Sequence, residues 1–189
     1  MIQLVGLAAP IIGAAFLVLF RQRAPGPVTV GLLACAAGIA ASIIGLLSEK
    51  SVFLGRDLEG MTHHLEMWGM VRLTVIALTV VLLMTAAGLG PHVSPTWIPL
   101  LLTGGVSSAA GAALRFVPID LGPEHEGLTF LALMVSEALQ FGLIGIGMIL
   151  MCLAVVASRP AKDGRDEPLA LARRIAGSLW RLRRSLLRS

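Results

Sequence analysis

The chain has 189 residues, of which 56% are hydrophobic and 14% are charged, and its formal net charge is +4. This composition, with a mean hydropathy of +0.86, excludes an ordinary soluble domain, because a fold of this length cannot bury so many apolar side chains. The two cysteines, Cys35 and Cys152, lie in apolar stretches without a CxxC partner, which favours packing residues over a disulfide or metal pair. The lack of tyrosine excludes a tyrosine radical or proton relay.

Five long apolar runs predict five membrane-spanning helices. We place them at about residues 2–20, 28–47, 67–89, 96–114 and 127–157. No Lys or Arg precedes the first run, so it lacks the basic start of a signal peptide, and we expect it to be retained. The fifth run exceeds the ~20 residues that cross a bilayer, so we expect it to tilt, to begin above the membrane, or to kink near Gly142, Gly145 and Gly147.

The segments between the runs alternate in charge, and this pattern predicts the orientation. Net charges are +2 for turn 21–27, −2 for loop 48–66, zero for turn 90–95, −2 for loop 115–126 and +6 for tail 158–189. Five crossings place all the basic segments on one side, which the positive-inside rule makes cytoplasmic. We therefore expect a multi-pass protein of a bacterial inner membrane, with the N-terminus outside and the C-terminus in the cytoplasm.

The tail, residues 158–189, has the pattern of an amphipathic basic helix. Asp166, Glu167 and Pro168 are suited to a helix start. Apolar residues then recur at spacings of three or four, at Leu171, Ile175, Leu179, Leu182 and Leu186. Arginines lie opposite or at the flank, with Trp180 among them: Arg173, Arg174, Arg181, Arg183, Arg184 and Arg188. We expect this helix to bind an anionic lipid surface, with a cytoplasmic partner protein as the alternative; we do not expect nucleic acid.

Small residues recur at intervals of four within two of the runs. One row contains Ala34, Gly38 and Ser42, and another contains Ser107 and Gly111. Such rows let helix backbones approach closely in a membrane. We expect them to pack within the bundle; the alternative is a docking face for another membrane subunit.

Ionisable side chains within the predicted spans are candidates for function, because burying them in lipid is costly. Arg72 lies in the third run and Glu137 in the fifth, and Arg115 ends the fourth run on the same side. We expect Arg72 and Glu137 to pair in a salt bridge that fastens helices. The alternative is a proton step, an ion step or an anionic-ligand site that uses Glu137, Arg72 and Arg115, with Gln140 on the face of Glu137.

The predicted outer loops contain residue types that bind metals. These are His63, His64, Glu66, Glu124, His125 and Glu126, which suit zinc, copper or iron. His64 and His125 could also be axial haem ligands if their helices meet. The spacing is not specific, since HExxH is absent and adjacent histidines on a helix do not easily share a metal. The sequence therefore assigns no cofactor.

The chain carries no catalytic signature, so we do not expect an enzyme. There is no GxSxG, no P-loop, no paired-Asp motif and no thiol pair suited to oxidoreduction. The fold class is all-α: a polytopic membrane protein with a five-helix bundle, residues 1–157, and the basic tail. The leading hypothesis is a non-catalytic subunit of a larger respiratory, photosynthetic or transport complex. The alternatives are a small oligomeric transporter or ion conductor using Glu137 and Arg72, and a haem- or metal-bearing electron-transfer anchor.

Overall fold

A computed structural model describes most of the chain. It covers residues 2–52, 58–93, 95–117, 126–157, 159, 168–172, 174, 175, 177 and 178, without the side chains of 2–5, 46, 48–52, 58–66 and 126. Across these ranges all regular structure is helical and no strand occurs. The all-α fold class is therefore confirmed.

The described part of the chain contains five long helices. They are α1 (Ile2–Leu19), α2 (Pro25–Val52), α3 (Leu58–Gly88), α4 (Trp97–Leu114) and α5 (Glu126–Val156). Four of them contain stretches long and apolar enough to cross a membrane: Pro25–Gly45, Met67–Gly88, Trp97–Leu114 and Gly127–Val156. The described apolar stretch of α1, Gly6–Leu19, is shorter. These helices define a multi-pass membrane protein with four candidate spans.

Three helix boundaries differ clearly from the sequence prediction. Helix α2 begins at Pro25, because prolines are tolerated in the first turn of a helix, where no N–H partner is needed. Both α2 and α3 extend into the predicted loop 48–66: α2 ends at Val52 and α3 begins at Leu58. This loop contains Leu, Glu, Lys and Met, which favour helix even where hydropathy falls.

Helix α5 is one continuous element despite its glycines. Its 31 residues extend about 46 Å at 1.5 Å per residue, against a hydrocarbon layer of about 30 Å. The helix is therefore long enough to tilt or to project from the membrane. It is also central, because it contacts each of the other four helices.

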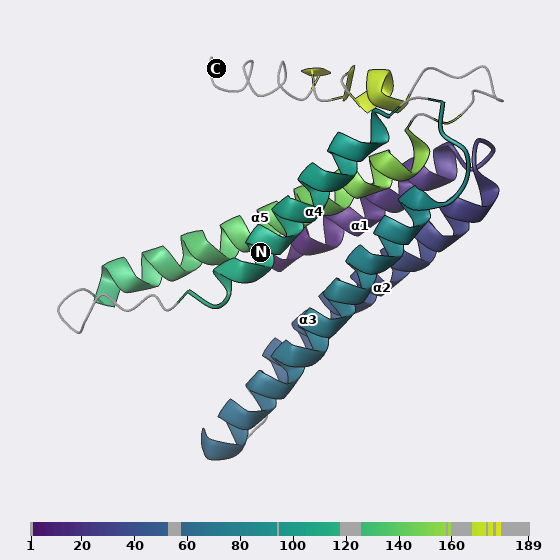
Figure 1. The fold of residues 1–189 in the computed structure, drawn as a ribbon. Coiled ribbons are helices and arrows are strands. Elements are labelled where there is room, and N and C mark those ends of the chain that lie inside the picture. Colours follow the sequence, from purple (N-terminus) through teal and green to yellow (C-terminus); the bar gives the residue numbers. More distant parts are fainter. Residues whose placement is uncertain are drawn as a thin grey trace.

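The helices are arranged as a V (Figure 1). One arm is the α2–α3 hairpin and the other is the α4–α5 hairpin, with α1 beside α5 and α2. The arms meet at the end that contains Phe20, Gly90 and Ala157, which we call the closed end. They diverge toward the beginnings of α3 and α5, which we call the open end (Figure 1). The two arms can therefore enclose a space only near their junction.

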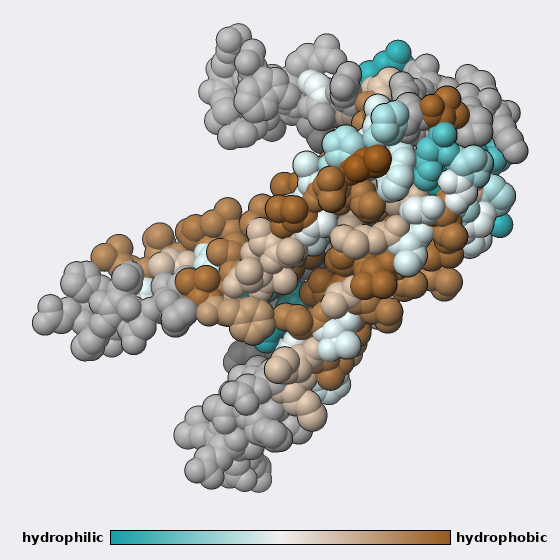
Figure 2. All heavy atoms as spheres, in the orientation of Figure 1, coloured by the Kyte–Doolittle hydropathy of each residue, from teal (hydrophilic) through white to brown (hydrophobic). Residues whose placement is uncertain are grey.

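The hydrophobic core is concentrated toward the closed end. Its largest fully buried side chains include Leu17, Phe20, Val28, Leu83 and Met151. Cys35 and Cys152 face each other in this core, with their Sγ atoms 3.8 Å apart. Toward the open end the arms instead carry apolar side chains on their surfaces (Figure 2), as expected of helices solvated by lipid.

The small-residue rows pack within the bundle. Ser42 Oγ donates to the Gly38 oxygen of its own helix at 3.0 Å and also lies 3.3 Å from the Gly6 carbonyl oxygen of α1. Ser107 Oγ donates to the Leu143 oxygen of α5 at 2.9 Å. A Cβ atom at Gly111 would lie 2.8 Å from Ile144 Cγ1. These contacts agree with the expected packing role of the rows.

Helices α4 and α5 approach each other closely at Gly147, and this predicts a glycine whose replacement is costly. A Cβ atom at Gly147 would meet the Ser108 side chain and lie 2.5 Å from the Gly104 oxygen, whereas one at Gly142 would meet nothing within 4 Å. We expect Gly147→Ala to destabilise the protein by about 1–3 kcal/mol through overpacking. Thermal unfolding in detergent measures this effect. Gly142→Ala is the matched control on the same helix, and equal melting of the two variants would contradict the packing.

Candidate functional site: a cavity between the two hairpins

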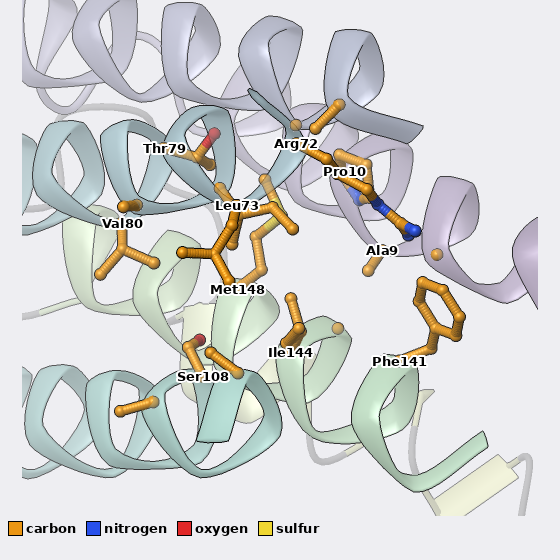
Figure 3. Close-up of a pocket in the computed structure, with 18 of the residues that line it drawn as sticks. Ala9, Pro10, Arg72, Leu73, Thr79, Val80, Ser108, Phe141, Ile144 and Met148 are labelled. Atoms are coloured by element: carbon orange, nitrogen blue, oxygen red, sulfur yellow. The ribbon is translucent and has the colours of Figure 1, made fainter. Parts of the chain in front are cut away.

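A cavity of about 350 Å³ lies where the arms of the V begin to separate. All five helices contribute to its wall, which is mostly apolar (Figure 3). Representative lining residues are Pro10 of α1, Ser42 of α2, Val80 of α3, Ser108 of α4 and Ile144 of α5. Its volume is at the lower end of the range for small-molecule sites, so it holds one chain or ring system rather than a whole diacyl lipid.

Arg72 projects from α3 across the gap between the arms (Figure 3). Its Cζ atom lies 4.7 Å from the centroid of the Phe141 ring on α5, in a cation–π contact. A Cβ atom at Gly45 of α2 would lie 3.1 Å from the same Cζ, so the absence of a side chain there makes room for the guanidinium. Arg72 therefore connects the two arms at the wall of the cavity.

The expected salt bridge between Arg72 and Glu137 does not form. Glu137 is exposed and does not line the cavity, whereas Phe141, one turn further along α5, lies beneath the guanidinium. The reason is the divergence of the arms: Glu137 is nearer the open end, where α3 has moved away. Gln140, which was expected on the same helix face as Glu137, lines the cavity, whereas Glu137 does not.

Arg115 supplies a second guanidinium to the cavity wall. It follows the last residue of α4, its side chain is exposed, and its Nη1 donates to the Gly69 oxygen of α3 at 3.5 Å. A side chain at Gly69 would collide with this guanidinium. Because Gly69 and Arg72 are one turn apart on α3, both arginines reach the cavity at neighbouring levels. Sequence analysis identified both arginines as an anionic-ligand candidate.

Two hydroxyl groups deeper in the cavity wall differ in whether they have a hydrogen-bond partner. Thr79 Oγ1 donates to the Val75 oxygen at 2.9 Å within its own helix. Ser108 Oγ is buried and has no hydrogen-bond partner in the described part of the chain. This oxygen packs closely against Gly147 of α5. Sequence analysis missed Ser108 and Phe141, since neither belongs to a motif; only their spacing relative to Gly111 and Glu137 places them on these faces.

A second polar cluster lies outside the cavity, at the closed end. Arg159 is only 6% exposed, and its Nε donates to the Val155 oxygen at 2.9 Å while Nη2 donates to the Ala86 oxygen at 3.4 Å. These carbonyls belong to the last turns of α5 and α3, where helix dipoles favour a cation. Gly90, with φ of +89°, passes so close that a Cβ atom would lie 2.7 Å from Arg159 Nη1. Burial lowers the pKa of Arg159.

His92 stacks beside this arginine cluster. Its ring centroid lies 4.4 Å from that of Trp97, and its Nε2 is buried without a partner among the described residues. Burial lowers the pKa of His92, and the positive charge of Arg159 lowers it further, although backbone hydrogen bonds to Ala87 and Gly90 act in the opposite direction. The imidazole is therefore neutral at pH 7.

Several residues singled out in the sequence lie outside the described parts. The side chains of His63, His64 and Glu66 on α3 are among these, as are His125 and the tail residues Arg173, Trp180, Arg181, Arg183, Arg184 and Arg188. Arg174 is described and exposed. Within the described ranges, no group of three or more His, Cys, Asp or Glu side chains could hold a metal ion. The metal and haem hypotheses therefore stay predictions.

Comparison with known proteins adds no relative. No protein-family model, no curated protein and no solved structure matches the chain.

The environment of His92 predicts a pH dependence of stability. Its folded-state pKa lies below the unfolded value of about 6.5, so the unfolded chain binds the proton first as pH falls. Stability from this group is complete above pH ~6.5 and is lost as pH falls toward the folded-state pKa. We expect melting temperature to fall more between pH 7.5 and pH 5.5 in the native protein than in His92→Gln. An equal fall in both proteins would show that His92 is not responsible.

Proposed function

We propose that this protein is a non-enzymatic membrane protein that binds an amphiphile in the cavity between its hairpins. The proposal rests on the apolar cavity, which lies where the two arms of the V begin to separate. A lipid-like molecule can reach such a site sideways from the bilayer, and its chain replaces the lipid that would otherwise fill the gap. The proposal refines the hypothesis of a non-catalytic membrane component.

The packed core at the closed end and the exposed position of Glu137 favour ligand binding over ion conduction. Beyond the cavity, Leu17, Leu83 and Met151 are fully buried in the closed-end core, which leaves no polar route. Glu137, the acidic residue that an ion-conducting mechanism would require, is exposed outside the cavity. A cavity bordered by this apolar core suits a binder more than a channel.

The proposed orientation places the open end at the outer face of a bacterial inner membrane. In this layout α1 crosses the membrane in addition to the four candidate spans, which makes five crossings. The N-terminus is then outside and the C-terminus is cytoplasmic. Support comes from the basic residues near the closed end, Arg21, Arg23 and Arg159, since positive charge is retained on the cytoplasmic side. The cavity then draws its ligand from the outer leaflet.

Filling the cavity should abolish binding without disturbing the fold. Ala109 lines the cavity and is exposed, whereas its neighbour Ala110 is equally exposed and does not line it. We expect Ala109→Phe to lower retention of monoolein, measured by native mass spectrometry of the detergent-purified protein, by about tenfold or more. Ala110→Phe, which adds the same ring to the outer surface, should retain it. Unchanged binding by Ala109→Phe would place the ligand elsewhere.

A second candidate function, a subunit of a larger membrane complex, is favoured by the start of the tail. Pro168 is fully buried, and Leu171 packs against the closed-end core. Ile175 and Arg174 are exposed just beyond. The tail segment therefore begins fixed across the closed end (Figure 1), at the inner membrane surface in the proposed orientation. There its basic residues would meet anionic lipid or other membrane subunits.

Shortening the tail separates these roles. A chain that ends after residue 172 keeps Pro168 and Leu171 and so should keep the closed-end packing. In gentle detergent we expect the full chain to co-migrate with a defined membrane partner and the shortened chain to lose it, as seen by mass spectrometry of the purified species. If the full chain migrates only with itself, the subunit candidate fails.

A further inference from the structure

We infer that Cys35 and Cys152 are a redox pair: two thiols that close to a disulfide when a lipid-soluble quinone oxidises them, and that then tie α2 to α5. The inference goes beyond the proposed function, since it depends on two sulfur atoms of the core and needs no resident ligand in the cavity. Sequence analysis favoured packing residues, because the two cysteines are far apart in the chain and share no CxxC motif. The fold nevertheless brings them together.

The two sulfur atoms are already in contact. Cys35 Sγ and Cys152 Sγ are 3.8 Å apart, and their side chains come from different helices, α2 and α5. A disulfide holds its sulfur atoms about 2 Å apart, so each sulfur has to move by only about 1 Å to form the bond. Rotation about the side-chain bonds, with small adjustments of the helices, can supply this shift.

The neighbouring helices hold the two sulfurs close together. A Cβ atom at Gly13 of α1 would lie 2.7 Å from Cys152 Sγ and 3.5 Å from Cys35 Sγ, so the backbone of α1 packs directly against the pair. One turn along the helices, a Cβ atom at Gly38 of α2 would lie 2.5 Å from Met148 Cε of α5. The close packing of α1, α2 and α5 therefore keeps the thiols facing each other, which raises the rate of a reaction between them.

The position of the pair determines the class of oxidant that can reach it. Cys35 is 1% exposed and Cys152 is 0% exposed, and both lie inside candidate spans, Pro25–Gly45 and Gly127–Val156. A charged, water-soluble oxidant such as glutathione disulfide does not enter such an apolar region. Met148, one turn from Cys152, lines the cavity (Figure 3), and displacement of this flexible side chain opens a path from the cavity to the thiols. The oxidant is therefore assigned to the quinones, which dissolve in lipid and have a ring that the cavity can hold.

The reaction balances without leaving a charge in the core. The S–H bonds of both cysteines break, an S–S bond forms, and the quinone takes up the two electrons and two protons to become a quinol. A soft metal ion such as Cu(I) also prefers sulfur ligands, but two thiolates around it carry a net negative charge, which is costly in an apolar core. The described residues also offer no group of three or more His, Cys, Asp or Glu side chains for a metal. These two points favour a disulfide over a metal site.

The disulfide would join the two arms of the V. Cys35 belongs to the α2–α3 arm and Cys152 to the α4–α5 arm. The cavity residues Gly38 and Met148 lie one turn from the cysteines, toward the open end, so the bond would fix the arms at the base of the cavity. It would also close the long stretch of chain between residues 35 and 152 into a loop, which stabilises the folded state.

The test uses the full-length protein, reduced and purified in neutral detergent without oxygen. Decylubiquinone is the oxidant, because its fully substituted ring oxidises thiols without adding to them, and glutathione disulfide is the water-soluble comparison. The chain has two cysteines in all, so maleimide labelling after denaturation counts the free thiols directly. Mass spectrometry of the intact chain detects the loss of two hydrogen atoms, and thermal unfolding gives a second measurement.

Two variants serve as controls. Cys35→Ala removes one thiol of the pair. Cys152→Ala combined with Ile146→Cys keeps one thiol on α2 and one on α5, but Ile146 is exposed and does not line the cavity. The second variant therefore matches the native protein in its number of thiols and differs in whether they face each other.

We expect decylubiquinone to remove both free thiols of the native protein at least about tenfold faster than it removes those of the double variant, because only the native thiols are held face to face. Glutathione disulfide should leave the native thiols free. The oxidised native protein should melt at least about 5 °C above the reduced protein, as expected for a disulfide that closes a long loop. Cys35→Ala should show no such shift with the quinone present.

Four results would overturn the inference. Two free thiols after the folded native protein meets the quinone would leave a packing pair only. Equal oxidation by glutathione disulfide would show that the pair is open to water, and equal oxidation of the double variant would show that its geometry is irrelevant. Retention of one equivalent of Cu(I) by a native protein that resists the quinone, with loss of the ion in Cys35→Ala, would make the pair a metal site. If a variant fails to fold, the thiol count and the mass of the native protein still decide, and none of these results bears on retention of monoolein.

Discussion

The packing of five helix ends at one side of the molecule is the constraint on which the remaining structure depends. Short turns after α1 and after α3 hold these ends together, and the buried side chains of Leu17, Phe20, Leu83 and Met151 fill the space between them. At the opposite side α2 is followed by α3 and α4 by α5, so each hairpin is held to its neighbour only near the junction. A cavity forms where this packing gives out, and it is lined by every helix because all five converge just beyond it.

Arginine is used differently at the two ends. Arg159 is buried against the carbonyl oxygens that end α3 and α5, and so it stabilises the closed end by capping. Arg72 and Arg115 lie at the cavity, where one is held by an aromatic ring and the other by a long hydrogen bond. The first arrangement satisfies the cation within the protein. The second places two guanidinium groups in the wall of the cavity.

Hydropathy predicts the helices well because lipid imposes a long apolar stretch on every crossing. It could not predict that α2 extends to Val52 or that α3 begins at Leu58. Those turns lie outside the apolar stretches, where helix propensity rather than hydropathy decides. Arg72 and Arg115 were identified from their cost in a membrane. The contact of Arg72 was predicted wrongly, because Glu137 and Phe141 share a helix face, and only the divergence of the arms determines which of them α3 can reach.

The sideways opening of the V has a consequence for how occupancy is set. A molecule that arrives through water is taken up according to its aqueous concentration, which for a lipid is extremely low. A molecule that slides in from the adjoining leaflet is taken up according to its mole fraction among its neighbours there. If the cavity binds an amphiphile as proposed, a modest intrinsic affinity is then sufficient, and the fraction of protein that is loaded would follow the composition of the surrounding membrane.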